Sequence, residues 1–263
     1  MRTLATRFAP IAALLLLAGC ASGGGFNLVS LEEEWQLGQQ LHADIARQMP
    51  LLSDATANAY INRLGQQIVS ETEMAQLPWH FHIIDSPEIN AMNIPGGHVY
   101  VTTGLIGAAD DVSELAGVVA HEVAHGVERH ATENMTKAYG LNVLASLLLG
   151  QDPAMYQQIL AQIVGGGAMA SFGRDAEREA DTLGTRYMYQ AGYDPRGMVT
   201  MFEELLRRRQ REPGAVDRFF STHPLTESRI AQVRSEIATL PQRANLISNT
   251  RDYNSFRSRF GRG

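Results

Sequence analysis

Apolar residues recur at helical spacing over most of the chain and alternate with polar residues in a central stretch. The helical spacing predicts two amphipathic helices, over residues 31–48 and 54–69, and the first opens on the capping-box sequence Ser30-Leu31-Glu32-Glu33. The alternation predicts strands over residues 79–85, 90–94 and 98–103, with a turn at Pro95-Gly96-Gly97 between the last two. The sheet is therefore expected to be small, with about three strands.

The second half of the chain returns to helical spacing. Asp111 and Glu114 have the D-x-x-E form of a capping box, and an apolar stripe follows at Leu115, Val118, Val119, Val123 and Val127. Further helices are expected over residues 177–189 and 195–209, then a loop to residue 224 and a last helix to about residue 239. These elements predict an α+β fold, mainly α, in one domain of residues 31–240.

Two segments have less definite patterns. Residues 141–149 are strongly apolar but are interrupted by Gly150-Gln151-Asp152-Pro153, so they are too short for a membrane span. We expect them in the core, and a hairpin that rests on the domain or faces a membrane is the alternative. Residues 241–263 are basic with interleaved aromatic residues, and we expect a solvated or loosely docked tail.

Residues 1–19 have the parts of a secretory signal peptide: two arginines, a short apolar run and small residues before Cys20. Leu17-Ala18-Gly19-Cys20 resembles the bacterial lipobox, in which the cysteine becomes the lipidated first residue of the mature protein. Because no Asp follows Cys20, we expect anchoring at the periplasmic face of the outer membrane, with residues 20–30 as a flexible tether. A cleaved signal with an incidental cysteine is the alternative.

Charge and cysteine content narrow the function classes. The chain has 22 basic and 28 acidic residues, and removal of residues 1–19 takes away two arginines and no acid, which leaves a net charge of −8. This balance argues against nucleic-acid binding and gives no electrostatic attraction to anionic lipid. Since Cys20 is the single cysteine, a hydrophobic core rather than disulfides must stabilise the domain.

The sequence His121-Glu122-Val123-Ala124-His125 is an H-E-x-x-H motif within the helix expected after Asp111. Four residues apart on a helix, His121 and His125 share a face and can both reach one Zn²⁺, while Glu122 leans toward the metal-bound water. The alternative is a buried helix with two hydrogen-bonded core histidines. A glutamate beside two facing histidines is costly to bury without a cation, so the motif favours a zinc hydrolase.

Catalytic zinc takes three protein ligands and keeps a fourth position open. Glu177 is the best candidate for the third ligand because it lies on a predicted helix together with Asp181, four residues later. Asp181 can accept the second ring N–H of a ligating histidine and hold its orientation. Glu179 is turned about 200° away from Glu177 and is expected in solvent.

As a set, these motifs resemble the HtpX and CAAX-prenyl-protease family of zinc metallopeptidases. The match includes the H-E-x-x-H motif, Arg174-x-x-Glu177-x-x-Ala180-Asp181, Asn90-Ala91-x-x-x-Pro95-Gly96-Gly97 upstream, and Thr222-His223-Pro224 with Arg229-Ile230 downstream. Within the family, the chain is most similar to the periplasmic outer-membrane lipoprotein peptidases of the LoiP type. It lacks the transmembrane helices of HtpX, and a tetratricopeptide extension is not expected.

The resemblance implies a compact, minigluzincin-like zincin fold with a small sheet over the active-site helix, and one Zn²⁺ per chain. It also implies proteolysis of misfolded outer-membrane proteins, with the outer-membrane assembly machinery as a further expected partner. An extended substrate would pair with the edge strand made of Asn90, Ala91, Met92, Asn93 and Ile94. Gly173 departs from the family, whose members often have Ser there, and we expect little consequence.

The other histidines are considered separately. His42, His80, His82 and His98 have no ligand spacing and are expected to be structural, and His130 is expected to cap the end of the motif helix. His223 matches a family position close to the zinc. It could stabilise the tetrahedral oxyanion or occupy the open metal position in a latent state.

The sequence therefore predicts a zinc endopeptidase that acts in envelope quality control, with His121, His125 and Glu177 as ligands and Glu122 as general base. The alternative is a non-enzymatic holdase or assembly factor at the outer membrane that keeps the zinc for stability. An intact Glu122 favours the enzyme, because structural zinc sites close the fourth position with a protein ligand and need no base.

Overall fold

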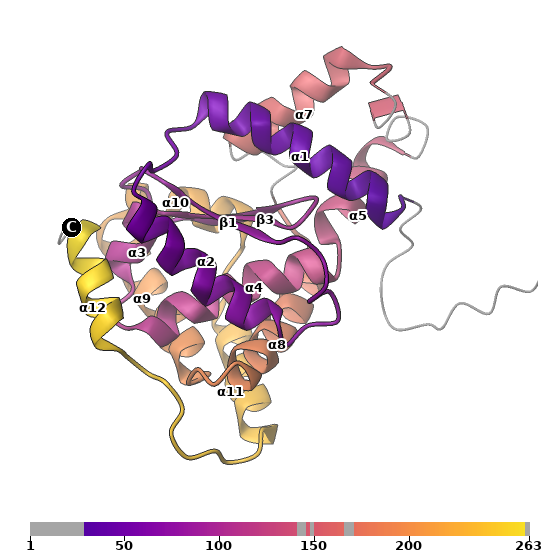
Figure 1. Ribbon diagram of the computed structural model, residues 1–263. Helices are drawn as coiled ribbons and strands as arrows, with labels where there is room; N and C mark the ends of the chain where they lie inside the picture. The colour runs from indigo at the N-terminus through magenta and orange to yellow at the C-terminus, as the bar shows by residue number, and fades with distance from the viewer. Residues whose placement is uncertain (1–28, 141–145, 148–149, 166–170, 261–263) are drawn as a thin grey trace, which may run out of the picture.

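The structure is a computed structural model that describes residues 29–140, 146–147, 150–165 and 171–260 (Figure 1). The elements before the motif helix are α1 (Leu31–Gln48), α2 (Ala55–Val69), β1 (His80–Ile84), β2 (Ala91–Ile94), β3 (His98–Thr102) and α3 (Thr103–Ala108). The remaining helices are α4 (Val112–Val127), α5 (His130–Tyr139), α7 (Pro153–Gly165), α8 (Arg174–Gln190), α9 (Arg196–Arg211), α10 (Pro213–Thr222), α11 (Glu227–Thr239) and α12 (Arg251–Arg257). The prediction of a mainly helical α+β fold is confirmed.

The sheet has three strands in the order β1-β3-β2. β2 and β3 form the predicted hairpin, and their turn contains Gly96 and Gly97 at φ of 84° and 72°, a backbone region that favours glycine. β1 pairs in parallel with β3, so that His80 lies opposite His98. β2 therefore lies at one edge of the sheet.

Helices cover both faces of the sheet (Figure 1). Phe81, Val99 and Val101 point into the larger core, which they share with α2, α4, α8 and α9. Tyr100 and Ile84 point the other way, into a second core under α1, α5 and α7. This alternation follows from the two-residue period of a strand.

Side-chain caps define where the first and the motif helix begin. The Ser30 capping box is present at α1, with hydrogen bonds in both directions between Ser30 and Glu33. At α4, Asp111 accepts from the Glu114 backbone N–H at 3.0 Å, and the Glu114 carboxylate accepts in turn from the backbone N–H of Asp110. Both predicted helix starts are confirmed.

The loop predicted over residues 210–224 is wrong, because α10 occupies most of it. Pro213 opens the helix at a position that needs no N–H, and Val216, Phe219 and Phe220 bury one face at i, i+3 and i+4. The residues around Pro213 are typical of turns, and for this reason the apolar stripe was not recognised as a helix in the sequence.

The expectation of a solvated or loosely docked C-terminal tail is also wrong. α12 is capped by Thr250 and buries Tyr253 and Phe256 in the larger core. The Tyr253 hydroxyl donates to the Ala109 carbonyl at 2.8 Å, directly before the motif helix.

Residues 141–149 lie largely outside the described residues, as do residues 1–28 with Cys20. Of the apolar segment, Leu147 is described and is buried in the second core. No helix in the described ranges has the length and apolar character needed to cross a membrane.

Candidate metal centre

The two motif histidines of helix α4 point their Nε2 atoms toward the same place. The Nε2 atoms of His121 and His125 lie 3.0 Å apart, and Glu177 reaches them from α8 with its carboxylate oxygens at 3.4 Å from His125 Nε2 and 3.6 Å from His121 Nε2. Two nitrogens on one tetrahedral Zn²⁺ are separated by roughly 3.3 Å, because Zn–N bonds are about 2.0–2.1 Å. The structure thus brings together the three residues predicted as ligands.

Close packing of α8 on α4 makes this approach possible. A Cβ at Gly184 of α8 would lie 3.0 Å from the backbone of Ala120 and His121, so a larger residue would push the two helices apart. Since Glu177 and Asp181 lie on the same helix and face α4, their distance from the histidines depends on this contact.

Asp181 and Arg229 lie behind the ligands. Asp181 Oδ1 lies 3.0 Å from His121 Nδ1, where it can hold the ring with Nε2 toward the centre. Arg229, from α11, donates to both oxygens of Asp181 at 2.7 Å and also contacts Glu177. Arg229 was not among the predicted site residues. Its place in the family motif, shortly after Thr222-His223-Pro224, could have indicated a role at the site.

His125 is held by two residues that the sequence did not assign to the site. Its Nδ1 lies 2.9 Å from Nδ1 of His130, and the Phe172 ring stacks on it at 4.0 Å between centroids. The expectation that His130 caps the motif helix is wrong: the C-cap is Glu128, the chain reverses at Arg129 with φ of 58°, and His130 begins α5. Glu179 lies 3.4 Å from His130, with 39% of its side chain exposed.

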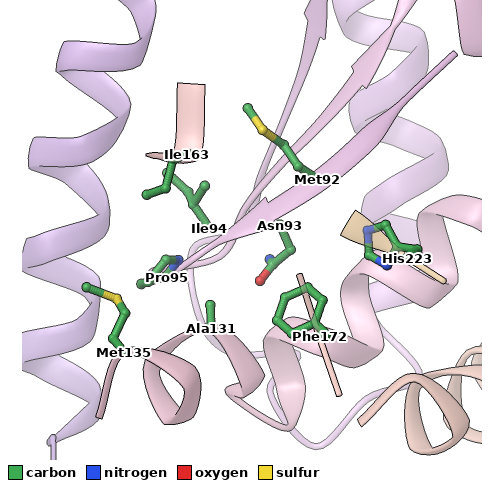
Figure 2. A pocket seen from close by; sticks show the side chains of 9 residues that line it. All are labelled: Met92, Asn93, Ile94, Pro95, Ala131, Met135, Ile163, Phe172 and His223. Carbon is green, nitrogen blue, oxygen red and sulfur yellow. The ribbon is translucent and has the colours of Figure 1, made fainter. Parts of the chain in front are cut away.

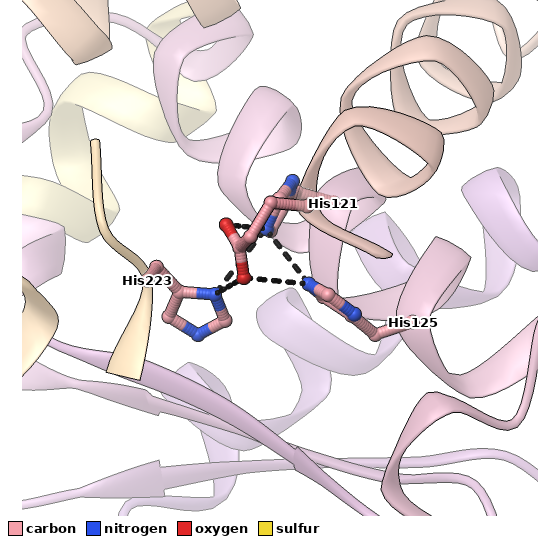
Figure 3. Close-up of side chains that lie close together, drawn as sticks. His121, His125 and His223 are labelled. Atoms are coloured by element: carbon pink, nitrogen blue, oxygen red, sulfur yellow. Dashed lines mark hydrogen bonds and ion pairs between the residues drawn. The ribbon is translucent and has the colours of Figure 1, made fainter. Parts of the chain in front are cut away.

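His223 lies inside the cluster, at the C-cap of α10. Figure 3 shows its ring directed toward His121 and His125. Its Nδ1 is 3.0 Å from Glu177 and 3.4 Å from His121 Nε2, while its Nε2 is 3.4 Å from Glu122 Oε1. His121, His125, Glu177 and His223 thus form one group whose donor atoms all lie within 4.8 Å of one another.

Burial and charge set the protonation of the group. Burial holds the pKa of His125 well below its ordinary value, so this imidazole is neutral and can act as a ligand. Burial alone would raise the pKa of Glu177, but the neighbouring imidazoles, His223 first, outweigh it and hold that pKa well below its ordinary value. Neutral imidazole and ionised carboxylate are the forms that bind zinc.

The carboxylate of Glu122 supports the presence of a cation. It is fully buried, and neither oxygen has a hydrogen-bond partner among the residues that the structure describes; His223 Nε2 lies 3.4 Å from Oε1 alone. An ionised carboxylate is costly to bury in this way unless a cation or a polar ligand lies beside it. The residues present therefore fit a zinc ion held by His121, His125 and Glu177.

The predicted substrate strand lies beside this centre. Asn90 precedes β2, which contains Ala91, Met92, Asn93 and Ile94, and all five residues are buried. Met92, Asn93 and Ile94 line a mainly apolar pocket together with Phe172 and His223, so the strand edge and the metal centre share one wall (Figure 2). Asn93 Nδ2 is buried without a hydrogen-bond partner within the described ranges.

Comparison with known proteins agrees with this arrangement of residues. The profile of Peptidase family M48 matches residues 55–237, which include every residue of the metal centre. The chain belongs to Peptidase family M48. Members of this family are zinc-dependent metallopeptidases, so the prediction of a metalloprotease is confirmed.

Individual relatives are also named as proteases or metalloendopeptidases. The chain is 32% identical over 260 residues to the beta-barrel assembly-enhancing protease of Escherichia coli (strain K12), which covers 95% of this chain and 52% of that protein. It is 30% identical over 213 residues to the mitochondrial metalloendopeptidase OMA1 of Schizosaccharomyces pombe, covering 79% and 62%. The corresponding protease of Yersinia pestis is 30% identical over 229 residues, covering 84% and 47%. The chain thus spans about half the length of the beta-barrel assembly-enhancing proteases that it matches.

Proposed function

We propose that this chain is a zinc-dependent endopeptidase that hydrolyses peptide bonds of misfolded or unassembled outer-membrane and periplasmic proteins. The buried Glu122 carboxylate beside three converging ligands carries the proposal, because a structural zinc site has no use for a general base. The bacterial relatives are named beta-barrel assembly-enhancing proteases, and these names support outer-membrane proteins as the substrate class.

His121, His125 and Glu177 would hold the zinc, which when bound would supply Lewis-acid activation of the scissile carbonyl and of the attacking water. Glu122 takes the proton of that water and passes it to the leaving amine. Asp181 keeps the His121 ring in place through Nδ1, and Arg229 neutralises the Asp181 charge. Phe172, stacked on His125, excludes water from one side of the centre.

The substrate is proposed to bind as an added strand at β2. Support comes from the edge position of β2 in the order β1-β3-β2 and from the Asn93 amide, whose Nδ2 has no hydrogen-bond partner among the described residues. Backbone pairing of this kind selects for unfolded chains, since a folded protein does not offer an extended segment. The apolar pocket next to Met92 would take an apolar side chain of the substrate.

Two further parts of the proposal concern the location of the enzyme. We place it at the periplasmic face of the outer membrane, anchored through lipid on Cys20, on the evidence of the lipobox-like sequence. The outer-membrane assembly machinery is the proposed partner, in line with the name of the Escherichia coli relative.

A holdase that retains structural zinc is the second candidate, and the position of His223 is the observation that favours it. His223 reaches the same group as the three ligands and could close the fourth position. A holdase would suppress aggregation of an unfolded outer-membrane protein without cleaving it.

One experiment separates the two candidates. Full-length protein is purified with zinc, and zinc content and casein degradation are measured for wild type and Glu122→Gln. The proposal expects equal zinc and at least about a hundredfold loss of proteolysis in Glu122→Gln, the scale of a lost general base. Absence of proteolysis in both proteins, with aggregation suppressed equally by both, would establish the holdase instead.

A further inference from the structure

A second group of histidines lies on the opposite face of the sheet from the metal centre. His82 on β1 and His98 on β3 point toward α1, as does Tyr100, because residues two apart on a strand share a face. His42 of α1 meets them there.

One pair of nitrogens in this group lies at a ligand distance, and the third ring lies against both. His82 Nε2 is 3.1 Å from His98 Nδ1, close to the roughly 3.3 Å that separates two nitrogens on one tetrahedral zinc. The His42 ring lies 4.3 Å from the His82 ring and 4.6 Å from the His98 ring, between centroids. One donor atom from each of the three residues lies within 4.8 Å of the other two.

We infer that His42, His82 and His98 form a second metal site, separate from the peptidase centre, for a divalent transition ion such as Zn²⁺. The ligand set is made of imidazoles without carboxylate, which suits Zn²⁺, Cu²⁺ and Ni²⁺ and does not suit Mg²⁺ or Ca²⁺. The ion would join α1 to the sheet, because one ligand comes from α1 and two from adjacent strands.

The surroundings prepare the rings for this role. Tyr100 Oη lies 2.8 Å from His42 Nδ1, and a hydroxyl can accept from that nitrogen while the other ring nitrogen holds the ion. Burial and the neighbouring imidazoles lower the pKa of His82 and His98 to about 3, so both rings are neutral at physiological pH. His80 is exposed beside His98, and His42 and His82 are only half-buried, so solvent reaches the edge of the group.

Packing alone does not account for the cluster. The second core around it is built from apolar side chains such as Leu41 and Ile45, which would fill the same space without burying ring nitrogens. Three stacked imidazoles instead place polar nitrogens in this layer, where His82 Nε2 contacts His98 Nδ1 and His42 Nδ1 contacts Tyr100 Oη. A bound cation would replace the contact between His82 and His98 as the partner of both lone pairs.

Metal stoichiometry tests the site without relying on activity. Full-length protein is equilibrated by dialysis with micromolar free Zn²⁺, and zinc per chain is measured. Wild type should hold two ions, His42→Gln one, and His125→Ala one. His80→Asn is the matched control: its ring is a neighbour of the group but not a member, so this variant should keep two.

Thermal unfolding gives an independent measurement in the His125→Ala background, where the peptidase centre is disabled. Zn²⁺ should raise the Tm of His125→Ala, and this rise should disappear in His125→Ala combined with His42→Gln, because only binding to the folded state stabilises it. The half-buried His42 is chosen over the more buried His98 to keep the fold intact. One zinc per wild-type chain that is lost in His125→Ala, or two zinc ions retained in His42→Gln, would overturn the inference.

Discussion

Arg229 donates two hydrogen bonds of 2.7 Å to the two carboxylate oxygens of Asp181, and both side chains are buried. The pair links α11 to α8 directly behind the ligand His121. Burial alone would raise the pKa of Asp181, but the Arg229 hydrogen bonds outweigh it and hold the pKa below its ordinary value. Asp181 therefore stays ionised and can orient His121.

Loss of Arg229 should destabilise the fold strongly. Arg229→Met leaves the Asp181 charge buried without its partner, and we expect a loss of about 3–5 kcal/mol in the free energy of unfolding. Arg234→Met is the control: it lies on the same helix, and its ion pair with Glu203 is exposed, so its effect should stay within about 0.5 kcal/mol. Denaturant unfolding of both variants measures the difference, and equal midpoints would contradict the structural role of the buried pair.

The third ligand can be tested with two glutamates of one helix. Glu177→Ala should abolish zinc retention on dialysis, because the carboxylate that approaches both motif histidines is removed. Glu179→Ala should retain zinc, since Glu179 is partly exposed and its contact near the site is with His130 rather than with a ligand. Atomic absorption after dialysis measures both. Zinc loss in Glu179→Ala with retention in Glu177→Ala would show that the ligand assignment is wrong.

The sequence predicted the local part of the structure well, for physical reasons. The helix that contains His121 and His125 follows from the caps at Asp111 and Glu114 and from its apolar stripe, all of which are short-range signals. The hairpin around Pro95 follows in the same way from turn residues between two strands.

Contacts between distant segments could not be read from local patterns. The pairing of His80 with His98 requires β1 to lie beside β3 rather than beside β2, its neighbour in the chain, and this parallel pairing brings His82 and His98 together. Likewise, the proximity of Phe172 to His125 depends on how α8 approaches α4.

The membrane anchor is tested by one substitution. Cys20→Ser should give an unprocessed or soluble periplasmic protein, because acyl chains supply about 0.8 kcal/mol per buried CH₂ and the acidic chain has no electrostatic attraction to the membrane. Ser22→Ala keeps the cysteine and serves as the control. Membrane fractionation after a high-salt wash is the measurement, and recovery of Cys20→Ser in the outer-membrane fraction would point to another anchor, such as residues 141–149.

The two roles of His223 predict opposite signs for one substitution. In the structure its Nε2 lies 3.4 Å from Glu122 and its Nδ1 lies 3.0 Å from Glu177, so the ring stands between the base and a ligand. If His223 is a latch, meaning that its imidazole occupies the open metal position in a latent state, it would block the attacking water. His223→Ala would then raise basal proteolysis. An oxyanion donor acts mainly in the transition state, so its loss would lower turnover at constant zinc content.

We expect the increase, because a ring 3.4 Å from the base and 3.0 Å from a ligand would compete with water for the open metal position. Ser221→Ala is the matched control: this exposed residue at the same end of α10 donates its hydroxyl to the Arg218 carbonyl and has no contact with the metal centre among the described residues. Zinc content and initial rates on an unfolded outer-membrane protein are measured for wild type and both variants. A lower rate with full zinc would exclude the latch, and an unchanged rate would exclude both roles, leaving His223 as a buried partner of the two carboxylates.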